Sequence, residues 1–197
     1  MLGIFLDSET NGLNFQKHRI VEIAFKIVDI LTGQVKDSYE SLVCVTQEEW
    51  AKSDPASLKV NGFTWEEASK GLPPSMVGTQ IQEMFAKNKI KRGEAVFICQ
   101  NPSFDRVFFS QLIDADIQES LLWPYHWLDL ASMYWGKTIK EGSTGTGNYP
   151  WETGYSKDKI AIANSLPKEG QPHRAMNGVD HLILCYKAVV GFPKKVL

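Results

Sequence analysis

Two carboxylates follow the first apolar strand of the chain, and this feature restricts what the rest can fold into. Apolar residues run from Leu2 to Leu6, which predicts a buried strand, and Asp7 and Glu9 follow two positions apart. Residues two apart in an extended chain project from the same face. Carboxylates held side by side repel, and hard cations such as Mg²⁺ or Mn²⁺ relieve the repulsion. An alternative is that Asp7 opens a turn and Glu9 is solvated.

Size and charge narrow the function classes. A chain of 197 residues is long enough to bury a sizeable core, so we predict one domain over residues 1–197. A hydrophobic content of 43% and a charged content of 22% are typical of a soluble globular protein. The net charge of -2 disfavours a protein that coats nucleic acid with its whole surface. Any contact with nucleic acid should therefore be local.

Cysteine usage and the absence of targeting segments predict a cytoplasmic protein. Cys44, Cys99 and Cys185 are far apart, have no zinc-site spacing and are odd in number, so we expect buried thiols in a reducing compartment. The start of the chain has no basic segment leading into an apolar one, and no run of eighteen apolar residues occurs, so we expect no membrane partner. No glycine-rich turn follows an apolar strand, which excludes a dinucleotide-binding oxidoreductase.

Five strands are predicted. Residues 18–29 and 35–45 are rich in β-branched side chains and should form an antiparallel meander with the first strand. The first strand should be central because both its faces are apolar. Residues 95–99 should run parallel to it, and 123–130 should hold a short last strand that leads into a helix through Trp135. The fold class is therefore α/β with a mixed sheet flanked by helices.

Helix signals lie between and after these strands. Thr46 and Thr64 begin capping-box patterns, and apolar residues recur at helical spacing over 76–89. Ser156 should cap a helix through Leu166, and a closing helix should run from about Asp180 to Val190. The Gly, Ser, Thr and Asn residues of 136–154 predict a long lid or binding loop.

Three pieces of sequence carry candidate site residues. They are Asp7 with Glu9, then Asp105 just after the fourth strand, and His173 with Asp180 before the closing helix. Each has an ordinary alternative, because Asp105 could be a first-turn acid of a helix, His173 a surface histidine and Asp180 an N-cap.

The contexts of these residues resemble a known family. Residues 5–13 with 18–24 resemble the first motif of the DEDDh-type 3′-to-5′ exonucleases, which include proofreading exonucleases, ribonuclease T and oligoribonuclease. Residues 101–105 resemble the second motif, and 172–176 resemble the opening of the third. The resemblance spans nearly the whole chain in order. It implies an RNase H-like fold with a mixed five-stranded sheet.

The resemblance also implies a chemistry. Two divalent cations, Mg²⁺ or Mn²⁺, are expected at the scissile phosphate, with Asp7 bridging both, Glu9 binding one and Asp105 serving the second. His173 is expected to act as the general base that takes a proton from the attacking water. The implied reaction releases nucleoside 5′-monophosphates from single-stranded DNA or RNA 3′ ends. A polymerase or a second copy of the chain is a further partner that the resemblance leaves open.

The fourth carboxylate is where the chain departs from the family. The family has an Asp five residues after the histidine, and this chain has Gly178 there and Asp180 two residues later. On a continuous helix two residues correspond to about 200° of rotation, which would aim Asp180 away. If Gly178 delays the helix, Asp180 can reach the metal, and we expect it to be the fourth ligand. The alternatives are a weakened metal site and a protein that binds ends without cutting them.

Substrate contacts are expected from residues near the first two motifs. The residues expected to bind substrate are Thr10, Asn11, Leu13, Asn101, Phe104 and Phe109, with a core position as the alternative for Phe104. Tyr149, Trp151 and Tyr155 could stack on bases or could pack the 136–154 loop down.

Overall fold

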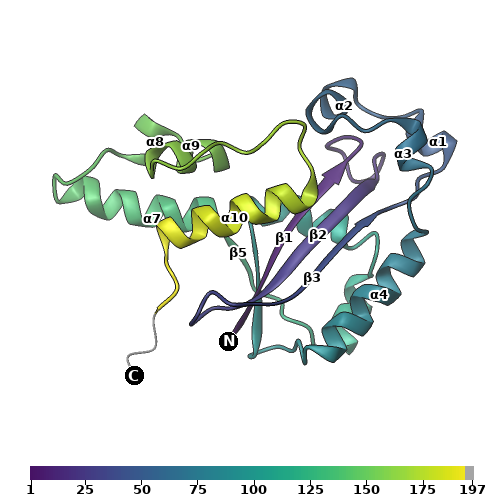
Figure 1. Ribbon diagram of the computed structural model, residues 1–197, viewed down its shortest axis with the longest axis horizontal. Helices are drawn as coiled ribbons and strands as arrows, with labels where there is room; N and C mark the ends of the chain where they lie inside the picture. The colour runs from purple at the N-terminus through teal and green to yellow at the C-terminus, as the bar shows by residue number, and fades with distance from the viewer. Residues whose placement is uncertain (194–197) are drawn as a thin grey trace.

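A five-stranded sheet forms the centre of the protein, whose computed structural model describes residues 1–193 (Figure 1). The strands are β1 (Leu2–Thr10), β2 (Ile20–Asp29), β3 (Val35–Leu42), β4 (Ala95–Cys99) and β5 (Trp127–Asp129), in the order β3-β2-β1-β4-β5. β1 is antiparallel to β2 and parallel to β4, and β5 is parallel to β4. The mixed sheet and the central place of the first strand are therefore confirmed.

Ten helices among the described residues connect and cover the strands. They are α1 (Gln47–Trp50), α2 (Pro55–Asn61), α3 (Trp65–Ala68), α4 (Pro74–Lys87), α5 (Pro102–Phe109), α6 (Ala115–Ser120), α7 (Leu130–Ser143), α8 (Pro150–Thr153), α9 (Lys157–Ala163) and α10 (Ala175–Val189).

The two faces of β1 pack against different helices. Ile4 and Leu6 belong to the apolar cluster that contains the inward face of α4, whereas Phe5 belongs to the cluster under α7, α9 and α10. Figure 1 shows α7 and α10 on one side of the sheet and α4 on the other. Side chains alternate along a strand, so Asp7 and Glu9 share the face of Phe5 and point toward α10. The pattern of β1 thus places both carboxylates under the last helix.

The predicted loop over 136–154 is helical in its first part. α7 continues to Ser143, with the Asp129 carboxylate accepting hydrogen bonds from the backbone N–H groups of Ala131 and Ser132 at its start. Gly136 lies on the exposed side of α7, where a helical glycine costs only about 1 kcal/mol relative to alanine. A good N-cap of similar magnitude offsets this cost. The loop prediction was therefore wrong up to Ser143.

The closing helix begins earlier than its pattern predicted. α10 starts at Ala175, whose backbone N–H donates to the Glu22 carboxylate over 2.7 Å, so a buried side chain of β2 satisfies the helix start. Gly178 lies inside this helix, and its N–H donates to the carbonyl of Arg174. The expectation that Gly178 delays the helix was wrong.

The predicted helix starts at Thr46, Thr64 and Ser156 are confirmed. Thr46 and Thr64 each form a capping box, and the Ser156 hydroxyl accepts a hydrogen bond from the Lys159 N–H at the start of α9. The prediction of buried thiols holds for Cys99 and Cys185, whereas Cys44 is only partly buried. Within the described residues, no helix combines the length and the apolar character needed to cross a membrane.

Candidate active site

Four of the five predicted catalytic residues line one pocket of about 360 Å³. The pocket opens where β1 and β4 end, and α9 and the segment before α10 close its other side. Its lining consists of Asp7, Ser8, Glu9, Gln100, Phe104, Asp105, Ser156, Lys157, Asp158, Glu169 and His173. Residues separated by more than 160 positions are therefore brought together.

Asp105 is positioned by the turn after β4. Asn101 has a left-handed backbone with φ of 60°, and its N–H donates to the Asp129 carboxylate over 3.0 Å, which directs α5 across the end of β1. Asp105 then lies in the first turn of α5 and is almost fully buried. The Ser8 hydroxyl donates to Asp105 Oδ1 over 2.7 Å. The two sequence motifs are joined by this hydrogen bond.

His173 reaches the pocket from the loop between α9 and α10. Its backbone N–H donates to the carbonyl of Val60 over 3.1 Å, which ties the loop to α2. The His173 ring stays partly exposed, with Nδ1 3.8 Å from Glu169 Oε1. An accessible imidazole beside a buried carboxylate is suited to proton transfer.

The carboxylates of the pocket are costly to ionise. Burial raises the pKa of Glu9 to about 8, with a further contribution from the charge of Asp7. Burial and Asp7 likewise raise the pKa of Asp105 to about 8, and burial raises the pKa of Asp7. A cation bound among these groups would stabilise their ionised forms, because opposite charge lowers a carboxyl pKa.

Lys157 and Glu169 complete the pocket, and neither is among the site residues predicted from the sequence. The Lys157 Nζ lies 3.2 Å from Asp7 Oδ1 and 2.8 Å from Glu169 Oε2. Burial lowers the pKa of Lys157, but the carboxylates of Asp7 and Glu169 outweigh burial and hold it above the usual value. The sequence feature that could have drawn attention to them is Gly178, where the family resemblance implies a carboxylate.

Asp180 is not brought to the pocket. Its carboxylate forms an ion pair with Lys26 of β2, and its side chain is 56% exposed. Because α10 is continuous through Gly178, Asp180 is rotated about 200° from that position, as a regular helix requires. Gly178 itself faces the pocket, since a Cβ there would lie 2.1 Å from Asp7 Oδ2. The placement expected for Asp180 therefore differs from the one observed.

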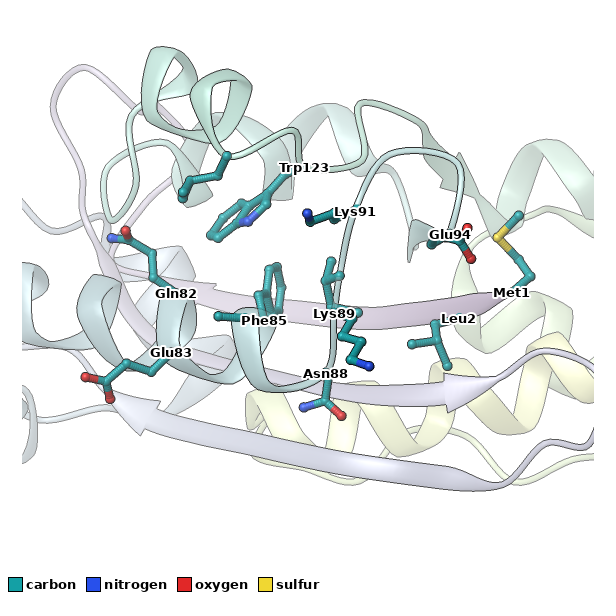
Figure 2. A pocket seen from close by; sticks show the side chains of 13 residues that line it. Met1, Leu2, Gln82, Glu83, Phe85, Asn88, Lys89, Lys91, Glu94 and Trp123 are labelled. Atoms are coloured by element: carbon teal, nitrogen blue, oxygen red, sulfur yellow. The ribbon is translucent and has the colours of Figure 1, made fainter.

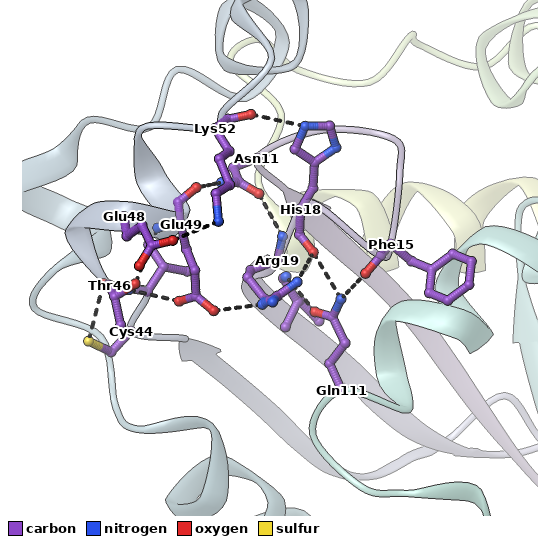
Figure 3. A network of polar contacts seen from close by, with 12 residues as sticks. Asn11, Phe15, His18, Arg19, Cys44, Thr46, Glu48, Glu49, Lys52 and Gln111 are labelled. Carbon is purple, nitrogen blue, oxygen red and sulfur yellow. Dashed lines mark hydrogen bonds and ion pairs between the residues drawn. The ribbon is translucent and has the colours of Figure 1, made fainter.

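Thr10 and Asn11, at the end of β1, fix the turn rather than line the pocket. Asn11 is fully buried, its amide donates to the carbonyl of Glu49 and the hydroxyl of Ser53, and its Oδ1 accepts from the Arg19 N–H. This network, drawn in Figure 3, joins the turn to α1 and β2. The hydroxyl of Thr10 donates to the carbonyl of Gly12. Neither side chain is among those that line the pocket.

The remaining predicted substrate residues have different surroundings. Leu13 is exposed beyond the turn, Asn101 is exposed at the start of α5, and Phe104 is half-buried in the pocket wall. Phe109 is fully buried between Phe97 and Trp127, on the face of α5 that packs against the sheet. The prediction that Phe109 contacts substrate is incompatible with this position.

An aromatic cluster of Trp135, Tyr149, Trp151 and Tyr155 lies beside the pocket. Tyr149 and Trp151 stack with ring centroids 4.6 Å apart, and Trp135 packs edge-on against Tyr155 at 5.3 Å. The carbonyl of Tyr155 accepts a hydrogen bond from Gln100, which lines the pocket. Trp151 remains 59% exposed. The cluster packs the segment down and also presents aromatic rings to solvent.

The pocket residues fit a divalent cation by donor type. Asp7, Glu9 and Asp105 supply the carboxylate oxygens that Mg²⁺ and Mn²⁺ prefer. Over residues 1–193 no three His, Cys, Asp or Glu side chains surround a common point as finished ligands. Asp7 and Asp105 instead use an oxygen on Lys157 and Ser8 respectively. Binding of an ion therefore requires these side chains to turn toward it.

A second cavity is remote from the carboxylates. It has a volume of about 930 Å³ and lies at the amino end of β1, opposite to the end that carries Asp7 and Glu9. Figure 2 shows Phe85 and Trp123 on one side of it and Met1, Leu2 and Glu94 on the other. It has a mainly apolar wall and no cluster of catalytic side chains.

Comparison with known proteins gives the family of the chain and proteins of similar fold. The family model described as Exonuclease, of the RNase T type, matches residues 4–181. Escherichia coli exonuclease I in complex with a dT13 oligonucleotide has a TM-score of 0.71 at 18% identity, covering 95% of this chain and 40% of its own. The cell-death related nuclease CRN-4 has a TM-score of 0.70 at 13% identity, covering 94% of this chain and 62% of its own.

These matches define the extent of the likeness. No curated protein sequence matches the chain. The chain spans about two fifths of the length of exonuclease I. The shared part covers 95–96% of this chain. The fold is RNase H-like, and the protein belongs to the exonuclease family.

Proposed function

We propose that the protein is a metal-dependent 3′-to-5′ exonuclease that releases nucleoside 5′-monophosphates from single-stranded DNA or RNA ends. The observation that carries the proposal is the convergence of Asp7, Glu9, Asp105 and His173 in one open pocket. Membership of the exonuclease family supports nuclease activity in general. The polarity, the substrate and the metal dependence are the parts that experiment has to test.

Asp7, Glu9 and Asp105 would hold the divalent cations that the family resemblance implies. Such a cation would polarise the scissile phosphate and lower the pKa of a bound water. The protein would supply ionised carboxylate oxygens from the wall of the pocket. Ser8 helps by holding Asp105 through its hydroxyl, which leaves the other carboxylate oxygen available.

His173 is the proposed general base. It would accept the proton of the water that attacks the phosphorus, while the bond from phosphorus to the 3′ oxygen of the preceding nucleotide breaks. The leaving oxygen takes a proton and becomes the new 3′ hydroxyl, and the attacked phosphate leaves as a 5′-monophosphate. The Glu169 carboxylate stands beside the His173 ring, with Oε1 3.8 Å from Nδ1.

The aromatic cluster is the proposed contact for the single strand upstream of the scissile bond. Exposed rings stack on any base without reading sequence. Trp151 and Tyr155 are about half exposed, and the Gln100 hydrogen bond links this cluster to the pocket. Exonuclease I, the structural neighbour, has been seen with dT13 and dA16 oligonucleotides. We place the protein in the cytoplasm, where its free thiols would stay reduced.

A second candidate function is end binding without cleavage. The observation in its favour is Gly178, which leaves the third motif without its carboxylate, together with Lys157 on Asp7. A protein of this kind would still admit a 3′ end to the pocket but would lack hydrolysis.

Digestion of labelled oligonucleotides separates the two functions. Single-stranded DNA and RNA with a 5′ label are incubated with the purified protein and Mn²⁺, Mg²⁺ or EDTA. A ladder that shortens from the 3′ end with metal, and disappears in EDTA, supports the exonuclease. The Asp7→Ala variant should give no ladder and keep its circular dichroism spectrum. Wild-type binding of the oligonucleotide without any ladder would favour the second function.

A further inference from the structure

The Lys157 ammonium is surrounded by oxygen atoms of the kind that bind metal ions. Its Nζ lies 2.8 Å from Glu169 Oε2, 3.2 Å from Asp7 Oδ1 and 3.4 Å from the carbonyl oxygen of Gly178. The side chain is only 12% exposed. Two carboxylates and a backbone carbonyl around one cation make up a donor set that also suits a hard divalent ion.

Gly178 explains why the ammonium fits there. The position carries no side chain, and Asp7 fills the space, because a Cβ at Gly178 would meet Asp7 Oδ2 at 2.1 Å. Asp7 therefore has Oδ2 against α10 and Oδ1 on Lys157. A divalent ion on the α10 side of Asp7 would stand next to a buried ammonium, and like charges at that distance repel strongly.

Glu169 provides the carboxylate that position 178 lacks. Its side chain is 3% exposed, Oε2 accepts from Lys157, and Oε1 has no hydrogen-bond partner among the described residues although Glu169 lines the pocket. A buried carboxylate oxygen without a partner is costly, so this atom is available to a ligand or to His173.

We propose that the Lys157 ammonium, held by Glu169, replaces one of the two divalent ions of the site, so that each chain binds a single divalent ion near Glu9 and Asp105. This inference rests on the proposed function and refines its cofactor count. Lys157 supplies a fixed positive charge beside Asp7, facing the position of the scissile phosphate. A charge fixed in place needs no reorganisation when negative charge develops.

Counting bound Mn²⁺ tests the proposal. The protein is titrated with MnCl₂, and free Mn²⁺ is measured from its electron paramagnetic resonance signal. We expect one bound ion per wild-type chain and two in Lys157→Met, which is one atom shorter, removes the charge and frees the oxygens of Asp7 and Glu169. Lys159→Met, an exposed lysine two residues on in α9, is the matched control and should still bind one.

Each outcome has a separate meaning. Two ions on the wild-type chain, or one ion on both wild type and Lys157→Met, would overturn the role of Lys157 and leave the metal-dependent exonuclease intact. No bound ion and no hydrolysis would overturn the proposed function itself. If Lys157→Met does not fold without metal, its thermal unfolding is measured in the presence of Mn²⁺. If it does not fold with Mn²⁺ either, the number of ions bound by the wild-type chain decides the question alone.

Discussion

Neutral groups hold the strand half of the pocket, whereas charges hold its helix half. In the strand half, which contains Glu9 and Asp105, the Ser8 hydroxyl donates to Asp105, and the turn at Asn101 directs the helix that carries Asp105. In the helix half, which contains Lys157, Glu169 and Gly178, a buried ion pair joins Lys157 to Glu169. Asp7 lines the same pocket and pairs with Lys157 of the helix half. The comparison teaches that Gly178, which has no side chain, leaves room that the Asp7 carboxylate occupies, beside the pair of Lys157 and Glu169.

The largest loss should come from the strand half. Asp105→Asn keeps the shape and the Ser8 hydrogen bond but removes an ionised oxygen, so hydrolysis should fall on the order of a thousandfold. Steady-state cleavage of a labelled oligonucleotide measures this. Asp116→Asn is the matched control, because Asp116 is also a first-turn acid, in α6, and lies outside the pocket. Equal effects of the two changes would mean that Asp105 acts only on the helix dipole.

In the helix half, Glu169→Gln should lower hydrolysis less than Asp105→Asn does, but it should lower the free energy of unfolding more. Hydrolysis should fall about 10-fold to 100-fold, because Glu169 acts through Lys157 and His173. The free energy of unfolding should fall by about 3 kcal/mol, because a buried ammonium loses a partner. Urea denaturation measures the second quantity.

Glu48→Gln is the matched control for that change. Glu48 pairs with Lys52 on the surface of α1, and its side chain is 84% exposed. Removal of an exposed pair should change the free energy of unfolding by less than about 1 kcal/mol. If both glutamates gave the same small change, the contrast between the two kinds of ion pair in this protein would disappear.

The sequence was sufficient for the sheet and for the strand half. Asp7, Glu9 and Asp105 follow apolar strands directly, and the ends of parallel strands β1 and β4 meet at one edge. The local chain therefore determines where these carboxylates lie. Asn11 and Phe109 were harder, because their burial depends on α1 and on packing over the sheet. Local patterns do not contain that information.

The helix half could not be predicted for a related reason. Lys157 and Glu169 meet only because α9 and the following loop fold against the start of α10. The choice of Asp180 depended on a break at Gly178, but α10 begins at Ala175 because Glu22 of β2 accepts its first N–H group. A tertiary contact thus sets the helix start and, through it, the direction of Asp180.

The aromatic cluster adjoins the helix half and tests whether that half still serves the substrate. Trp151→Ala should weaken binding of a single-stranded oligonucleotide about fivefold or more, because one base loses a stacking surface. Fluorescence anisotropy with the inactive Asp7→Ala protein measures binding without cleavage. Tyr125→Ala is a suitable control, since Tyr125 is equally exposed but packs on Arg92 near the remote cavity. Equal affinities in both variants would restrict the aromatic cluster to a packing role.

The smallest expected change in the free energy of unfolding comes from a comparison of two helical glycines. Gly136→Ala should raise the free energy of unfolding by about 1 kcal/mol, because a Cβ at this position in α7 meets nothing within 4 Å and alanine is the better helix former. Gly178→Ala should forgo this gain, because its Cβ would displace the Asp7 carboxylate. Urea denaturation and the cleavage assay, run on both variants, should show lost activity for Gly178→Ala alone. A stabilised and fully active Gly178→Ala would mean that the Asp7 carboxylate does not need the space left by the missing side chain at position 178. The contrast between the two halves of the pocket would then no longer depend on this glycine.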